Sequence, residues 1–299
     1  MERLLDACDE LGVRSVIFSG GGEPLAWNAG RFGDCLRSRV GYRRGLATNG
    51  LGVMRELGKE LLSRLDIIQI NINGYDEESF SWTTGTRLFS EFLSNMKWLF
   101  GTRDPELTQV SGKILLNRQN YKIVDQYLEF CSDFDFDLLI IKLAGNFEMG
   151  QDVELTEVEK CELSELLVTS PFVKKYRAKL DGITVGSNTM ELPLPEKCWT
   201  IELGLYVLVR SNGDVFPCVV SPYTPENRLG NIYKTSLQEM WESQHHRKIK
   251  SKLHRDMVMG ACKLNICRHL RYNFVIAEAL TSAQARESIW PLSERPKLL

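Results

Sequence analysis

The first 144 residues alternate short apolar runs of β-type with stretches of helical period. Five runs carry the β-branched and apolar content of buried strands, beginning near Ser15, Gly45, Ile67, Val110 and Asp137. Between them, apolar residues recur three and four positions apart, as on one face of a helix. Parallel strands need a crossover that is usually a helix, so the alternation predicts an α/β fold with at least five βα steps around a parallel sheet. The expected helices lie at Leu4–Leu11, Phe32–Leu36, Val53–Leu61, Phe89–Met96, Ile123–Leu128, Glu154–Leu167 and Val173–Leu180.

The pattern changes after residue 150, and we place a domain boundary near residue 185, giving domains 1–185 and 186–299. In the second domain, the β-type runs Ile201–Arg210 and Val215–Val220 flank an Asn212-Gly213 pair. Asn-Gly between two such runs predicts a β-hairpin. A basic stretch over 245–252 is expected to be a solvated helix face.

Composition narrows the class of protein. The 299 residues carry 37 basic and 39 acidic side chains, a net charge of −2, so charge does not indicate a nucleic-acid partner. No run approaches the roughly 18 apolar residues of a membrane helix, and the start lacks a signal-peptide pattern. We therefore expect a soluble cytoplasmic protein without a membrane partner. Its 8 cysteines then point to metal or redox roles, because a reducing compartment disfavours disulfides.

The cysteines separate into two groups of four. Cys198 and Cys218 bracket the predicted hairpin, and Cys262 and Cys267 form a close pair further on. Four thiolates suit either a zinc ion or an iron–sulfur cluster. The others fall on apolar helical faces and are expected in the core: Cys8, Cys35, Cys131 and Cys161.

Polar residues follow the predicted strands, at the edge of a parallel sheet where ligands bind. The first strand leads into Gly20-Gly-Gly-Glu-Pro24, whose glycines permit a sharp turn and whose Glu23 could hold a charged group. This run matches neither phosphate-binding glycine pattern. The polar residues at the strand ends are Glu23, Thr48, Asn49, Asn71, Asn73, Asn117, Arg118 and Lys142.

The order of these motifs resembles the radical S-adenosylmethionine (radical SAM) enzymes. The resemblance rests on Gly-Gly-Glu-Pro at 21–24, Thr-Asn-Gly at 48–50, Asn-Ile-Asn-Gly at 71–74 and Asn-Arg-Gln-Asn at 117–120. The region from Cys198 to Cys267 resembles the SPASM extension in its shortened twitch form. The resemblance implies a partial (β/α)6 TIM-like barrel without its first strand, followed by a small cysteine-rich domain of a β-hairpin and helices.

The resemblance also implies site residues. Gly21, Gly22 and Glu23 would contact the methionyl amino group of S-adenosylmethionine, Asn71 would lie near the ribose, and Arg118 would bind the methionyl carboxylate. Asn49 is a further candidate for binding this cofactor. In the family, the residues corresponding to Cys198, Cys218, Cys262 and Cys267 ligate one auxiliary [4Fe-4S] cluster.

The chain departs from the family at one motif. The Cys-x3-Cys-x2-Cys that binds the SAM-cleaving cluster does not occur in the 299 residues. We expect a truncated start rather than a loss of catalysis, a chain that is inactive alone, and a second [4Fe-4S] cluster only with the missing segment.

The activity implied is hydrogen abstraction by a 5′-deoxyadenosyl radical from a peptide, protein or small molecule, with flavodoxin or ferredoxin as electron donor. One alternative is a non-catalytic binding protein whose four cysteines hold a structural zinc ion or cluster. Another is an ordinary α/β enzyme with a zinc-ribbon-like appendage; it is the weakest, because all four histidines lie outside the βα region.

Overall fold

The computed structural model describes residues 2–20, 23–24, 32–34, 36, 41–52, 58–144, 153–176, 197–218, 224–259, 267 and 270–282. The chain divides into two compact units, Met1–Ser187 and Asn188–Leu299, each of which is described by itself.

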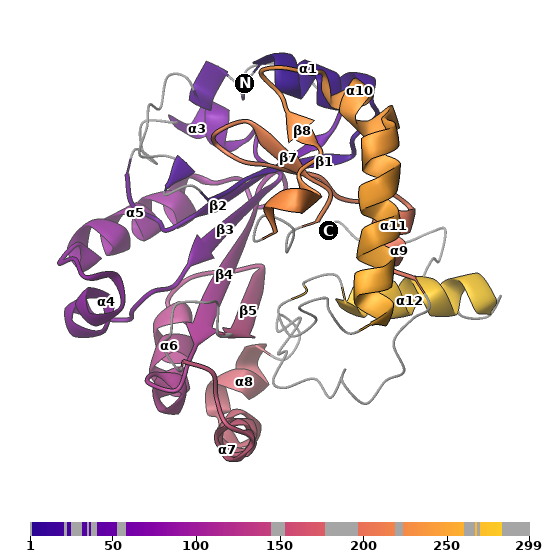
Figure 1. Ribbon diagram of the computed structural model, residues 1–299. Helices are drawn as coiled ribbons and strands as arrows, with labels where there is room; N and C mark the ends of the chain where they lie inside the picture. Colours follow the sequence, from indigo (N-terminus) through magenta and orange to yellow (C-terminus); the bar gives the residue numbers. More distant parts are fainter. Residues whose placement is uncertain are drawn as a thin grey trace. The chain divides into compact units, whose positions relative to one another are not determined.

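The first unit is built on one parallel sheet in the order β1-β2-β3-β4-β5 (Figure 1). Its strands are β1 (Ser15–Phe18), β2 (Arg43–Thr48), β3 (Ile67–Asn71), β4 (Gln109–Leu116) and β5 (Leu138–Leu143). Its α-helices are α1 (Glu2–Glu10), α3 (Gly58–Leu62), α4 (Glu77–Thr84), α5 (Phe89–Thr102), α6 (Val124–Cys131), α7 (Glu157–Thr169) and α8 (Pro171–Tyr176). Spatial order follows chain order, and the described strands form an open sheet, as expected for a partial barrel.

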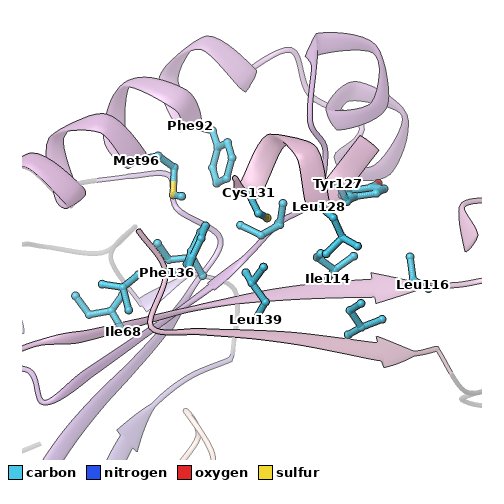
Figure 2. Packing of buried hydrophobic residues seen from close by; sticks show 14 of the residues in the cluster. Ile68, Phe92, Met96, Ile114, Leu116, Tyr127, Leu128, Cys131, Phe136 and Leu139 are labelled. Atoms are coloured by element: carbon cyan, nitrogen blue, oxygen red, sulfur yellow. The ribbon is translucent and has the colours of Figure 1, made fainter. Parts of the chain in front are cut away.

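The core of this unit lies between one face of the sheet and the helices that follow the strands. Figure 2 shows Phe92 and Met96 of α5 and Leu128 of α6 over Ile114 and Leu139 of the strands. Strand residues alternate, so that Ile68 and Ile70 are buried while their neighbours are partly exposed. Burying each such side chain contributes about 1.5–3 kcal/mol. The opposite face of the sheet is therefore left to polar and partly exposed residues.

Arg103 ties the end of α5 to the amino ends of β4 and β5. Its side chain, only 2% exposed, pairs with Asp137 and donates to the carbonyl oxygens of Asp135 and of Thr108, the latter at 3.2 Å. Asp137 in turn accepts the Val110 N–H at 2.7 Å. A buried guanidinium is tolerated because these oxygens replace its water. The cluster fixes the edge of the sheet opposite to the strand carboxyl ends.

In its described residues, the second unit combines a small antiparallel sheet with four α-helices. Its elements are α9 (Trp199–Glu202), β6 (Leu208–Val209), β7 (Asp214–Phe216), β8 (Gly230–Asn231), α10 (Leu237–Glu242), α11 (Gln244–Val258) and α12 (Leu270–Thr281). Strands β6 and β7 form the predicted hairpin, with Arg210 N–H bonded to the Asp214 carbonyl oxygen at 2.8 Å around a three-residue loop. Gly213 closes this loop at φ +84°, a conformation that glycine adopts without strain.

Several sequence predictions were wrong in detail. Cys161 was expected in the core but is exposed, because α7 buries the face that carries Leu163 and Leu167, and position 161 lies on the other side. The basic stretch in α11 is not wholly solvated, since His246 and Ile249 are buried.

In some segments, the observed secondary structure differs in type from the predicted one. The start of the first expected hairpin run is helical as α9, and helix α4 and strand β8 were not predicted. Cys8 and Cys131 are buried as expected. Cys35, residues 53–57 of an expected helix and residues 177–180 of another lie outside the described residues. No helix in the described ranges is both long and apolar enough to cross a lipid bilayer.

Candidate functional site

The polar residues singled out in the sequence lie along the carboxyl edge of the parallel sheet. The register pairs Thr48 of β2 with Ile70 of β3, and Asn71 of β3 with Lys113 of β4. The chain crosses this edge again at Glu23, after β1, and at Arg118, after β4. The sheet therefore brings one or two polar residues from each strand to a single edge, as predicted. Gly21 and Gly22 lie outside the described residues.

Glu23 is held in place by the end of the neighbouring strand. Its carboxylate accepts a hydrogen bond from the Thr48 hydroxyl at 2.8 Å and another from the Asn49 N–H at 2.7 Å. Hydrogen bonds to an ionised acceptor are about twice as strong as neutral ones, so the two bonds fix the position of the carboxylate. A carboxylate fixed at this edge fits the ammonium group of an amino-acid moiety.

The turn that presents these donors is itself rigid. The Thr48 oxygen accepts the Gly50 N–H at 3.0 Å, and the Asn49 side-chain oxygen accepts the Leu51 N–H at 2.8 Å. Gly50 has φ +79°, and a Cβ there would lie 2.6 Å from the Phe92 ring. Only glycine fits this position, and its carbonyl oxygen is held by Asn95 at 3.0 Å.

Arg118 forms hydrogen bonds with other residues of the first unit. Its Nε donates to Glu159 of α7 at 3.1 Å, and its backbone N–H bonds to the Val153 carbonyl oxygen at 3.0 Å. Hydrogen bonds from Thr156 and from Arg118 lower the pKa of Glu159. Arg118 therefore anchors the start of α7 to the end of β4, and the structure assigns its side chain a structural partner that the sequence did not reveal.

Asn71 lies on the sheet face opposite to the helices, in register with Lys113. Its side chain is partly exposed and has no hydrogen-bond partner among the residues that the structure describes. An amide in this setting can donate to and accept from a bound hydroxyl group.

The second candidate site is formed by the cysteines of the second unit. Cys198 precedes α9 and Cys218 follows β7, and both thiols are partly buried. Burial raises the pKa of the Cys198 thiol, backbone hydrogen bonds at the start of α9 lower it, and the nearby charge of Cys218 raises it further. The two thiols therefore lie within electrostatic range of each other.

The other two cysteines are less completely placed. Cys267 is described as partly buried, and Cys262 lies outside the described residues. Within the described ranges, no three His, Cys, Asp or Glu side chains form a group that could hold a metal ion. The four-cysteine ligand set thus remains a prediction.

Two side chains that the sequence did not single out hold Cys198. The Cys198 N–H donates to Nδ1 of His254 at 3.3 Å, and Asn273 of α12 contacts the Cys198 sulfur with its Nδ2 at 3.6 Å. His254 Nε2 lies 2.9 Å from the Glu202 carboxylate, which Lys250 also approaches at 3.3 Å. Partial burial alone would raise the pKa of Glu202, but the hydrogen bonds from Lys250 and His254 outweigh it and lower the pKa. Pairing between distant positions leaves no local pattern, which is why sequence reasoning missed these residues.

The comparisons with known proteins agree with this geometry. Residues 198–268 match the SPASM family, an iron-sulfur cluster-binding domain. The match begins at the first cysteine of the predicted ligand set and includes all four. No curated protein sequence matches the chain.

Solved structures with this fold include two proteins that have been solved with bound S-adenosylmethionine, SuiB and anSMEcpe. SuiB from Streptococcus suis aligns over 84% of this chain and 60% of its own, with 15% identity and a TM-score of 0.61. SuiB has also been solved bound to S-adenosylmethionine. The protein anSMEcpe, with bound AdoMet and the Kp18Cys peptide, aligns over 91% of this chain and 79% of its own, with 17% identity and a TM-score of 0.61. This chain therefore spans less than two thirds of the length of SuiB.

The chain therefore has the fold of the radical SAM enzymes and carries a SPASM iron–sulfur cluster-binding domain over residues 198–268.

Proposed function

We propose that the first unit binds S-adenosylmethionine at the carboxyl edge of its sheet and that the second unit binds one auxiliary [4Fe-4S] cluster, as parts of a radical SAM enzyme. The observation that carries the proposal is the match of residues 198–268 to the SPASM family on a chain with this fold. When bound, the cofactor and a reducing cluster supply a 5′-deoxyadenosyl radical for hydrogen abstraction.

The residues of the first unit have separate roles in this proposal. Glu23 accepts hydrogen bonds from the methionyl ammonium, together with the backbone of Gly21 and Gly22. Asn71 hydrogen-bonds the ribose, Asn49 borders the same site, and Arg118 binds the methionyl carboxylate in exchange for, or beside, Glu159. The fit is supported by the fixed carboxylate of Glu23, whose charge and position suit a cation.

In the second unit, Cys198, Cys218, Cys262 and Cys267 ligate the cluster as thiolates. The chemistry of the donor set supports the proposal, because four thiols suit an iron–sulfur cluster and the Cys198 sulfur receives an N–H hydrogen bond from Asn273. Cleavage of S-adenosylmethionine is proposed only for a protein that also has a Cys-x3-Cys-x2-Cys motif. For the 299 residues as given, the proposal is binding of S-adenosylmethionine and of one cluster.

A peptide or protein is the proposed substrate class. SuiB has been solved with its precursor peptide SuiA, and anSMEcpe with the Kp18Cys peptide. A one-electron donor such as flavodoxin or ferredoxin completes the proposed reaction.

The cluster is tested by anaerobic reconstitution of the full chain, followed by iron and sulfide analysis. We expect about four of each per chain, from the four-thiolate stoichiometry, and their loss in Cys198→Ser and Cys218→Ser. Cys8→Ser is the matched control, because its thiol is buried in the first unit. Zinc without sulfide would instead indicate a structural metal site in a binding protein.

The cofactor site is tested by calorimetric titration of Glu23→Gln. We expect weaker binding of S-adenosylmethionine but unchanged binding of 5′-methylthioadenosine, which has no methionyl amino group. Glu60→Gln, at an exposed position on α3, is the control. Equal effects on both ligands would contradict the role of Glu23, and no binding of S-adenosylmethionine by the unaltered chain would contradict the proposed site.

A further inference from the structure

Asn273 is an almost fully buried polar residue that lies beyond the cysteine-bearing segment. It belongs to α12, five positions after the SPASM match ends at residue 268. Its exposed fraction is 1%. A buried amide is costly unless its donors and acceptor are paired, so its partners indicate what it does.

The hydrogen bonds of Asn273 determine which way its amide points. Its Oδ1 lies 2.9 Å from the backbone nitrogen of Thr200 and 3.3 Å from the Thr200 hydroxyl. A backbone N–H can only donate, so the atom facing it must be the oxygen. The amide NH2 group is thereby directed at the Cys198 sulfur, at 3.6 Å, a usual separation for an N–H···S hydrogen bond because sulfur is larger than oxygen.

This contact joins two parts of the second unit through the proposed cluster ligand. Cys198 immediately precedes α9, and Thr200 lies in its first turn. One side chain from α12 therefore holds both the start of α9 and the sulfur atom beside it.

We propose that Asn273 is a positioning residue for the auxiliary cluster: it fixes the Cys198 sulfur as a ligand and raises the reduction potential of the cluster by donating an N–H···S hydrogen bond. The inference rests on the proposed function only in that Cys198 is a cluster ligand. A hydrogen bond to sulfur stabilises the reduced cluster more than the oxidised one, because reduction adds negative charge to the sulfur atoms.

The test compares reduction potentials of the anaerobically reconstituted full chain with and without this donor. Asn273→Leu keeps most of the volume and removes the N–H groups; Asn273→Ala serves if leucine does not fit the buried position. We expect the equilibrium constant for one-electron reduction to fall about tenfold, which is about 59 mV toward lower potential. Redox titration followed by electron paramagnetic resonance measures it, and circular dichroism checks folding.

Thr200→Val is the matched control, because it removes a hydroxyl from the same buried contact but leaves the N–H···S bond intact. Its potential is expected to equal that of the unaltered chain. A folded Asn273 variant that loses iron and sulfide while Thr200→Val retains them supports the positioning role. Unchanged reduction potentials in the Asn273 variants, or an equal drop in Thr200→Val, overturn this inference but not the proposed function. An unaltered chain that holds no cluster overturns the ligand assignment and this inference with it.

Discussion

Replacing Arg103 with methionine tests whether the buried arginine cluster holds the first unit together. The change removes the partner of Asp137 and the donor to the carbonyl oxygens of Thr108 and Asp135. Removing one member of a buried ion pair costs about 3–5 kcal/mol. Because Asp137 is 30% exposed and keeps its bond from Val110, it regains some hydration, and we expect the lower end, about 3 kcal/mol.

Hydrogen exchange of peptides from β4 and β5 measures this cost in the first unit alone. A loss of about 3 kcal/mol accelerates exchange on the order of 100-fold, since each 1.4 kcal/mol is a factor of ten. The control is Lys160→Met, which breaks a pair with Glu157, itself 86% exposed, and should cost less than about 0.5 kcal/mol. Exchange within threefold of the unaltered chain in Arg103→Met would refute the reasoning.

Three further predictions concern other described residues. In the native chain, Cys161 should be alkylated within minutes and Cys131 only on unfolding, because Cys161 is exposed, whereas burial excludes the reagent from Cys131 and raises the pKa of its thiol. Mass spectrometry of tryptic peptides measures the labelling of each cysteine. Equal labelling of the two would contradict the burial pattern. The folded pKa of Glu202 is lowered, so its contribution to the stability of the second unit should be present above about pH 4.3 and lost as the pH falls below it. Urea unfolding of Glu202→Gln at pH 7 and pH 4 should show a smaller acid-induced loss than the unaltered chain; an equal loss would show that other groups dominate. Gly50→Ala should destabilise the first unit by about 2 kcal/mol or more, because position 50 has a positive φ and an added Cβ would clash with Phe92. Gly101→Ala is the control and should not destabilise it, because the space around Gly101 is open. Thermal unfolding of the two variants measures the difference.

The parallel sheet was predictable because the local sequence of each strand has the apolar and β-branched content typical of strands. Ser15–Phe18 and Ile67–Asn71 were expected from their β-branched content, and the observed order β1-β2-β3-β4-β5 agrees with the tendency of successive βα units to place consecutive strands side by side. Helix α4 was missed because Glu77–Thr84 is short and carries little apolar periodicity, and its signal is the Asp76 and Ser79 capping box instead. Strand β8 was missed because two residues are too few to show a pattern, and pairing with β7 alone defines it.

The candidate site was also only partly predictable from the sequence. Glu23, Asn49 and Asn71 could be expected at the carboxyl edge, since strand ends in a parallel sheet share an edge. The partners of Arg118 and Cys198 could not, because Glu159 and Asn273 lie 41 and 75 positions away. Cys161 was misassigned because the leucines near it in the sequence suggested an apolar face, whereas the buried face of α7 carries Leu163 and Leu167 and Cys161 lies on the other side.

Helix α12 has a practical consequence for protein engineering. A chimera that transplants the cysteine-bearing unit by its family boundaries, residues 198–268, would leave Asn273 behind. The recipient would then carry the proposed sulfur ligands without the amide that we propose orients Cys198, and the Thr200 N–H would lose its acceptor. A functional transplant should therefore extend through Thr281, where α12 ends.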